Sequence, residues 1–218
     1  MESNNLPDEK NWNEFWQANN SSKFTRKSRS KTRIISLLEP LVKPEMTVLD
    51  AGCGSGFFSN YFIHGGCRVY ALDYSEDALK IAKKLTGSKA EAYLNLNLLD
   101  SQLGAKYKNK FDIIFSDGLL EHFNKEQQLQ IIENFKAMKK PSGIIATFVP
   151  NRYSWWQVVR PLFMPGIKEK PLTLKTLIEL HNGLDLIEKG GLNVLPLSVS
   201  PDKILGPRIG MLIYTLTR

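Results

Sequence analysis

An aspartate and three alternating glycines form the most distinctive chemical pattern in the chain, in the stretch VLDAGCGSGFF over 48–58. A dinucleotide-binding G-x-G-x-x-G loop needs a glycine at the position of Phe57, and a triphosphate-binding loop needs a lysine that is missing here. The Asp50 carboxylate would repel a phosphate at a helix N-terminus, so it favours a ligand with a cationic end, such as an ammonium or sulfonium. The glycines, which let backbone pass close to such a ligand, are Gly52, Gly54 and Gly56.

A second acid, Asp73, ends the apolar run RVYALD over 68–73. A carboxylate at the end of the strand after a glycine loop can accept two hydrogen bonds from a ribose diol. The alternative is a structural role, in which Asp73 or Ser75 caps the following helix. The position relative to the glycine loop favours the ribose contact.

Short apolar runs alternate with helical patterns along the chain, which predicts a mostly parallel sheet covered by helices. Gly183 ends a helix that Thr173 caps, and two strands follow it. The segment 190–207 is rich in glycine and proline and is predicted to be a loop, so the last two strands need not be parallel. The fold class is therefore α/β, a Rossmann-like three-layer sandwich whose seven-stranded sheet has one antiparallel strand near an edge. The predicted strands are 47–50, 68–73, 91–96, 111–116, 143–149, 184–189 and 210–217, and the clearest helices are 75–85 and 126–138.

Composition is that of one globular domain over residues 1–218, with 42% apolar and 23% charged residues. The first residues, MESNNLPDEK, have neither the basic start nor the apolar core of a secretory signal. No apolar run is long enough for a membrane span. Two cysteines, Cys53 and Cys67, make no disulfide framework, so we expect a reducing, cytoplasmic compartment.

The net charge of +7 is unevenly distributed along the chain. One interpretation is a patch for nucleic acid, phosphate or lipid headgroups, and the other is a solvated helix face. The basic cluster consists of Lys23, Arg26, Lys27, Arg29, Lys31 and Arg33, with Lys43 a little beyond.

Four stretches in order, VLDAGCGSGFFS, VYALDYSEDALKIAKK, FDIIFSDGLLEHF and PSGIIATFVPN, resemble the successive motifs of class I S-adenosylmethionine-dependent methyltransferases. The resemblance covers about residues 45–190 and is closest to the small-molecule branch that includes the ubiquinone- and menaquinone-pathway enzymes. It implies S-adenosylmethionine as cofactor and S-adenosylhomocysteine as product. It also implies methyl transfer to a small organic acceptor by in-line displacement.

The resemblance assigns the cofactor's parts to particular residues. Asp50 and the glycine loop, with Cys53 inside it, would hold the methionine part, and Asp73 the ribose hydroxyls. Tyr74 would pack on the adenine face. The family's adenine-binding acid falls on Asn97, followed by Leu98, which is a departure from the pattern, and Asp100 is the alternative.

The fourth strand leads into SDGLLEHF over 116–123, where Ser116 and Asp117 should line the donor pocket because ligands bind beyond the carboxyl ends of parallel strands. This stretch lacks the Asn/Asp-Pro-Pro-aromatic run of enzymes that methylate amino groups of DNA bases, which argues against a flipped-base substrate. His122 is the candidate base, if the acceptor must lose a proton. A structural role for its ring is the alternative, and Glu121 fits a helix-turn carboxylate. No Cys/His set has metal-ligand spacing, so the sequence predicts no metal.

Two segments outside the core sheet are expected to cover the donor site: an N-terminal helical cap over 1–44 and a lid over 150–173. Both carry bulky aromatic residues, which either line an apolar acceptor pocket or anchor the lid to the core. The mixture of Trp, Arg and Leu at 155–163 would also suit a bilayer surface, although prolines limit any helix in this segment. The candidate acceptor contacts are Trp16, Arg152, Tyr153 and Trp156.

Three functions therefore remain for test. The main hypothesis is a methyltransferase with a small-molecule acceptor, and the second keeps the cofactor but has an RNA or lipid-linked acceptor. The third is a protein that binds S-adenosylmethionine without turnover, because a fold does not prove a function. The acceptor, the methylated atom and the oligomeric state are not fixed by the sequence.

Overall fold

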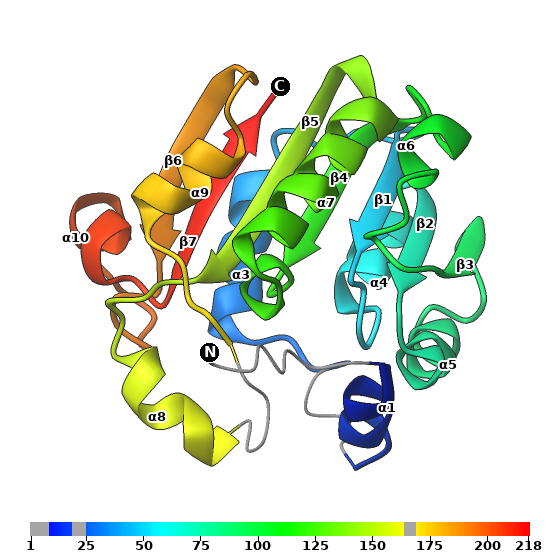
Figure 1. Ribbon diagram of the computed structural model, residues 1–218. Helices are drawn as coiled ribbons and strands as arrows, with labels where there is room; N and C mark the ends of the chain where they lie inside the picture. The colour runs from blue at the N-terminus through cyan, green and yellow to red at the C-terminus, as the bar shows by residue number, and fades with distance from the viewer. Residues whose placement is uncertain (1–8, 19–24, 164–168) are drawn as a thin grey trace, which may run out of the picture.

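The computed structural model describes residues 9–18, 25–163 and 169–218. In these residues one seven-stranded sheet has the order β3-β2-β1-β4-β5-β7-β6 (Figure 1). The strands are β1 (Thr47–Ala51), β2 (Arg68–Asp73), β3 (Ala92–Asn95), β4 (Phe111–Asp117), β5 (Lys139–Pro150), β6 (Leu186–Leu192) and β7 (Leu212–Thr217).

The sheet is parallel from β3 to β5, and β7 runs antiparallel to both of its neighbours. The predicted fold, a mostly parallel seven-stranded sheet with an antiparallel strand near one edge, is confirmed. The inner strand β1 is buried along its whole length. That burial is expected of a parallel strand whose two faces are both covered by helices.

Helices cover both faces of the sheet (Figure 1). On one face α3, α4 and α5 pack on the strands, and on the other α6, α7 and α9 do so. The helices are α1 (Glu9–Ala18), α3 (Arg29–Leu38), α4 (Phe57–His64), α5 (Glu76–Leu85), α6 (Leu103–Lys106), α7 (Lys125–Met138), α8 (Trp156–Phe163), α9 (Leu174–Leu180) and α10 (Asp202–Ile209), with a 3-10 turn η1 (Leu120–His122).

Helix caps are where the sequence places them. The Ser75 hydroxyl accepts a hydrogen bond from the Ala78 N–H at 3.2 Å and begins α5. Thr173 accepts one from the Thr176 N–H at 3.1 Å and begins α9. These caps fix where each helix leaves the strand before it.

The segment predicted as a loop over 190–207 is the main correction to the fold. Strand β6 continues to Leu192, and α10 follows and packs against it. A Cβ on Gly191 would lie 2.0 Å from the Gly206 carbonyl oxygen, so two glycines let helix and strand backbones touch. Glycine and proline in the sequence suggested a loop, but here they allow a close helix–strand packing.

The 1–44 segment has two different positions in the described residues. Helix α1 packs on α5 through Phe15 and Trp16 and lies beside the carboxyl ends of the strands (Figure 1). Helix α3 instead packs on the sheet, with Ile34 and Leu38 fully buried in the core. Helix α1 therefore lies outside the core, whereas α3 belongs to it.

None of the helices in the described residues combines the length and apolar character that crossing a bilayer requires.

Candidate active site

A cavity of about 630 Å³ opens at the carboxyl ends of β1, β2 and β4, a volume typical of small-molecule sites. One part of its lining, here called the loop wall, comes from the glycine loop, Asp73 and residues 96–99. Another part, the aromatic wall, contains Trp12, His122 and Trp156 together with the carboxylates Glu121 and Glu169. The two walls come from different kinds of element.

The glycine loop follows β1, and its three glycines all have positive φ, of 71°, 48° and 78° in order. A Cβ on Gly52 would lie 2.9 Å from Leu119, and one on Gly54 would lie 2.8 Å from the Trp16 ring. Gly52, Cys53 and Gly54 line the cavity. The loop therefore presents bare backbone to the cavity, with Trp16 packed on it.

Gly56 has a different role from the predicted one, which was to bind the ligand. It is the left-handed N-cap of α4 and is not part of the cavity lining. A Cβ there would lie 2.7 Å from the backbone of Ala82 in α5. Its lack of a side chain is needed for helix packing rather than for approach of a ligand.

Asp50 is 2% exposed at the base of the loop wall, and its carboxylate accepts a hydrogen bond from the Ser59 hydroxyl at 2.6 Å. Burial raises the pKa of Asp50 to about 7, Ser59 opposes the rise, and the neighbouring Asp73 and Asp117 add to it. A cationic group in the cavity would relieve this cost and hold Asp50 ionised.

Asp73 is fixed by backbone donors. Its two carboxylate oxygens accept hydrogen bonds from the Gly54 N–H at 2.8 Å and the Ser75 N–H at 2.9 Å. Burial raises the pKa of Asp73, and these hydrogen bonds oppose the rise. Ser75, not Asp73, caps α5, so the Asp73 carboxylate keeps lone pairs on the cavity side.

Residues after β3 line the cavity together with Tyr74, which is 40% exposed. Asn97 and Leu98 are both in the lining, while Asp100 is outside it and accepts a hydrogen bond from the Gln102 N–H. The Asn97 side-chain carbonyl already accepts one from the Leu99 N–H at 2.9 Å. Its amide group therefore has its N–H donors left for a ligand.

The end of β4 separates two residues that were predicted to act together. Asp117 lines the cavity, and burial raises its pKa to about 6 while Lys31 opposes the rise. Ser116 is 1% exposed and lies outside the lining. Successive side chains of a strand point to opposite faces of the sheet, so Ser116 cannot share the pocket with Asp117.

The turn η1 carries His122 into the aromatic wall. The Trp12 and His122 rings meet edge-to-face, with centroids 4.7 Å apart. The His122 Nε2 lies 3.8 Å from a Glu121 carboxylate oxygen. Burial raises the pKa of Glu121 well above its usual range; nearby Glu169 adds to the rise and Arg160 opposes it.

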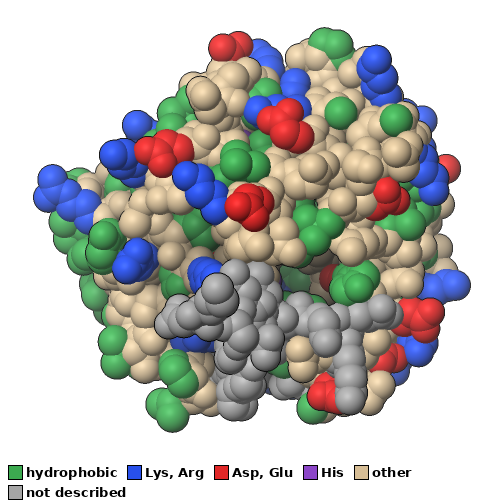
Figure 2. Space-filling model, viewed as in Figure 1, with side chains coloured by type: hydrophobic (Ala, Val, Ile, Leu, Met, Phe, Trp, Pro, Cys, Tyr) green, Lys and Arg blue, Asp and Glu red, His purple; other side chains and the backbone are tan. Residues whose placement is uncertain are grey.

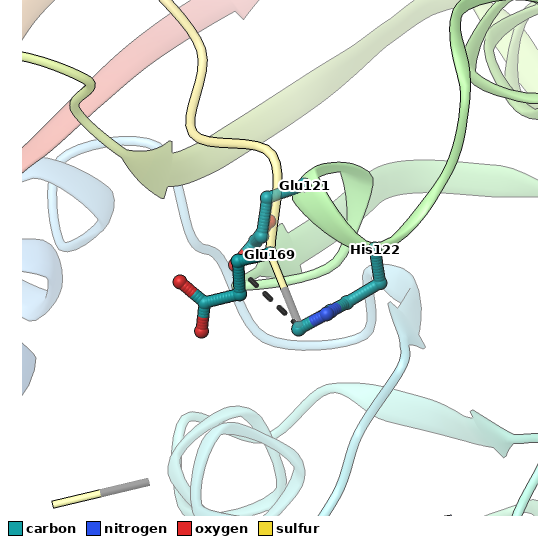
Figure 3. A group of neighbouring side chains, drawn as sticks. All are labelled: Glu121, His122 and Glu169. Atoms are coloured by element: carbon teal, nitrogen blue, oxygen red, sulfur yellow. Dashed lines mark ion pairs between the residues drawn. The ribbon is translucent and has the colours of Figure 1, made fainter. Parts of the chain in front are cut away.

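Glu169, from the segment before α9, joins Glu121 and His122 in one group (Figure 3). Its carboxylate lies 3.4 Å from the Arg160 Nε. A hydrogen bond from the Lys170 N–H to the Glu121 carbonyl, 2.8 Å long, ties this segment to η1. No local sequence pattern points to Glu169, because only the folded chain brings it to the exit of the fourth strand.

Of the four predicted acceptor contacts, Trp16 and Trp156 line the cavity. Arg152 and Tyr153 do not: both are exposed, Tyr153 by 66%. The Asn151 side chain accepts a hydrogen bond from the Tyr153 N–H and begins a turn there, and both side chains of this turn point outward. Met164 of the predicted lid lies outside the described residues.

The basic cluster is divided among three roles. Arg29 and Arg33 donate hydrogen bonds to the carbonyls of Pro196, Leu195 and Leu197, and Arg33 also pairs with Asp202. Lys31 lines the cavity with its ammonium 4.1 Å from the centre of the Phe57 ring, and burial lowers its pKa to about 8. Arg26 and Lys27 are exposed, and Lys23 lies outside the described residues.

Comparisons with known proteins identify the family of the chain. Residues 42–182 match the family described as methyltransferase domain. A ubiquinone biosynthesis O-methyltransferase from Coxiella burnetii is 33% identical over 105 residues, which are 48% of this chain and 44% of that protein. A malonyl-[acyl-carrier protein] O-methyltransferase from Hamiltonella defensa is 45% identical over 98 residues, covering 45% of this chain and 35% of that protein. The chain thus spans less than half the length of these curated relatives.

Solved structures share the fold at low identity. The N-methyltransferase NodS from Bradyrhizobium japonicum, in complex with S-adenosylhomocysteine, superposes with a TM-score of 0.67 at 16% identity, covering 96% of this chain and 97% of NodS. An S-adenosylmethionine-dependent methyltransferase from Anabaena variabilis gives 0.71 at 18% identity, covering 95% and 93%. The chain therefore belongs to the methyltransferase-domain family, and S-adenosylmethionine is its cofactor.

Proposed function

We propose that the chain transfers the methyl group of S-adenosylmethionine to a hydroxyl oxygen of a small, largely apolar acceptor. The observation that carries the proposal is the contrast between the two walls of one cavity. The loop wall offers buried carboxylates and bare backbone, while the aromatic wall offers Trp12 and Trp156 around one imidazole. The curated relatives cited above are named as O-methyltransferases.

The loop wall is assigned to the cofactor. Asp50 would hold the amino group of the methionine part, because its buried carboxylate needs a positive charge beside it. Asp73 would accept the ribose hydroxyls through its remaining lone pairs. Tyr74 and Leu98 would sandwich the adenine, and the Asn97 amide would donate to a ring nitrogen.

The aromatic wall is assigned to the acceptor. The bound cofactor supplies a methyl carbon already activated by a sulfonium, so the chain's task is to align the acceptor oxygen with that carbon. His122 accepts the hydroxyl proton as the oxygen attacks. Trp12 and Phe15 of α1 exclude water from this step.

Labelled methyl transfer to a panel of apolar alcohols, phenols and carboxylic acids, with matching amines and thiols, tests the proposal. We expect labelled ethers or esters with at least one oxygen acceptor. Transfer to amines alone would contradict the choice of oxygen. Binding of S-adenosylhomocysteine without transfer to any member would favour a cofactor-binding protein without turnover.

A lipid-linked acceptor is a second candidate, favoured by exposed apolar side chains on α8, on α10 and in the segment before α10. Val158 and Leu162 are 81% and 82% exposed, Val199 81% and Ile204 79%. Figure 2 shows hydrophobic side chains along the left side and at the lower left, the side where Figure 1 places α10 and, below it, α8. Exposed basic residues close in sequence to these apolar side chains are Arg152, Lys203 and Arg208. Exposed apolar side chains with basic residues in the same segments suit an anionic bilayer surface.

Co-sedimentation with vesicles of mixed neutral and anionic phospholipid tests this second candidate. The chain should bind such vesicles, and the double variant Val158→Ser, Leu162→Ser should bind less while keeping its affinity for S-adenosylhomocysteine. Equal binding by both proteins, or none by the natural chain, would remove the lipid-linked acceptor.

A steep loss of RNA binding with added salt would instead revive a nucleic-acid acceptor, although Arg29 and Arg33 are engaged within the fold.

A cytoplasmic location is part of this proposal. Cys53 and Cys67 are both free and buried, as is expected of a chain that folds in a reducing compartment.

A further inference from the structure

Glu121, His122 and Glu169 each offer one ligating atom, and these atoms all lie within 4.8 Å of one another (Figure 3). All three residues line the cavity. The Glu121 side chain is 1% exposed, that of His122 6% and that of Glu169 3%. Two carboxylates and an imidazole are thus held together away from bulk water.

The group has unsatisfied acceptors. One carboxylate oxygen of Glu121 and one of Glu169 have no hydrogen-bond partner among the described residues. Arg160, 3.4 Å from Glu169, supplies one positive charge, and Asp117 adds a further negative one nearby. Buried carboxylates this close together are costly unless a cation or a proton neutralises them.

We infer that Glu121, His122 and Glu169 bind a divalent cation of the Mn²⁺ or Zn²⁺ kind, which holds the acceptor's hydroxyl oxygen for methylation. Two carboxylate oxygens and one imidazole nitrogen are a donor set for first-row transition metals rather than for calcium. Three protein ligands leave coordination positions open, and the cavity is the space into which the group faces.

The inference deepens the proposed oxygen methylation and rests on it. A cation that holds a hydroxyl lowers the pKa of that hydroxyl, so the proton leaves to water at neutral pH. An oxygen lone pair then forms the O–C bond to the methyl group, and the electrons of the breaking C–S bond stay on sulfur. In this arrangement His122 serves as a ligand, and the cation takes over the role proposed above for His122 as base.

Titration of the chelator-treated full chain with Mn²⁺, followed by electron paramagnetic resonance, tests the site without needing an acceptor. We expect one bound ion per chain. Glu121→Gln and Glu169→Gln should each weaken binding by at least about tenfold, the loss that even outer-shell partners of a metal cause. Glu126→Gln, an exposed acid at the start of α7, is the matched control and should bind as the natural chain does.

No retained Mn²⁺ in the natural chain, or equal retention in both glutamine variants, would overturn the site and leave a shared proton as the neutralising charge. Circular dichroism and binding of S-adenosylhomocysteine show that each variant is folded. Should Glu121→Gln fail to fold, Glu169→Gln decides, since Glu169 lies outside the sheet, in the segment before α9 whose next residue, Lys170, is exposed.

Failure of this inference and of the proposed function are distinguishable. Methyl transfer to oxygen that is unchanged by chelator, with no Mn²⁺ bound, removes the cation and keeps the proposed function. Binding of Mn²⁺ by these residues, with no methyl transfer to any oxygen acceptor, keeps the cation site and removes the proposed function.

Discussion

The loop wall and the aromatic wall of the cavity differ in how the chain builds them. The loop wall comes from consecutive strand ends, and backbone N–H groups fix its acids, as Gly54 and Ser75 fix Asp73. The aromatic wall gathers α1, η1 and α8 with the segment before α9, and side chains such as Trp12 and His122 meet across them. A local backbone motif can specify a shared cofactor, while side chains from distant segments can vary to suit an acceptor.

The largest effect is expected at the aromatic wall. His122→Asn should lower kcat by about a hundredfold to ten-thousandfold, the range of a lost proton-transfer group, and leave the affinity for S-adenosylhomocysteine within about twofold. His64→Asn, on the exposed end of α4, is the control. Steady-state kinetics and calorimetry on the same samples measure the effect on kcat and on cofactor affinity separately. A loss of cofactor affinity as large as the loss of kcat would contradict the assignment of the two walls to different ligands.

At the loop wall, Asp73→Ala should weaken S-adenosylhomocysteine binding by about a hundredfold. It removes two hydrogen bonds between a carboxylate and the ribose, each contributing roughly 1.5 kcal/mol. Asp100→Ala, outside the cavity, should leave calorimetric affinity unchanged. If Asp100→Ala gave the larger loss, the adenine contact assigned to Asn97 would be wrong.

The pH dependence of binding tests Asp50. Because the pKa of Asp50 is raised to about 7 and the cationic ligand binds its ionised form, affinity should fall by about tenfold per pH unit below that value. In the free chain the same raised pKa means that stability falls as pH rises from about 4 to 7. Asp50→Asn should therefore melt higher than the natural chain at pH 8 while binding ligand weakly at every pH. A natural chain with pH-independent affinity would contradict the role of Asp50.

A comparison of two glycines tests the packing role of Gly56, with Gly87 outside the loop as the reference. Gly56→Ala combines a positive φ with a clash against α5 and should lower the free energy of unfolding by about 2 kcal/mol or more. Gly87 has a φ of +59°, but no atom lies near the position of a Cβ there. Gly87→Ala should therefore lower the free energy of unfolding only by the cost of the positive φ. Equal losses in urea denaturation would mean that contact with Ala82 contributes nothing.

The smallest effect is expected at Arg152 and Tyr153. Alanine at either exposed position should change kcat/KM by no more than about twofold, whereas Trp156→Ala should raise KM for the acceptor. A large loss at Tyr153 would show that the 151–155 turn reorients toward the cavity when an acceptor binds.

The same contrast explains what sequence could predict. The strand ends, the glycine loop and the caps at Ser75 and Thr173 are encoded within a few residues, and they lie where the pattern placed them. Ser116 and Asp117 were both predicted to line the pocket because they stand at the end of the fourth strand, but alternation along β4 separates them. Glu169 and α10 depend on contacts between distant segments, which no local pattern records.

Calorimetric titration of the chain with S-adenosylhomocysteine, in parallel with Asp73→Ala, is the most direct test of the central claim that the loop wall binds this cofactor. The account predicts one molecule bound per chain and a loss of about a hundredfold in the variant, with both proteins folded by circular dichroism. Absence of binding to the folded natural chain, or equal affinity in the variant, would contradict it.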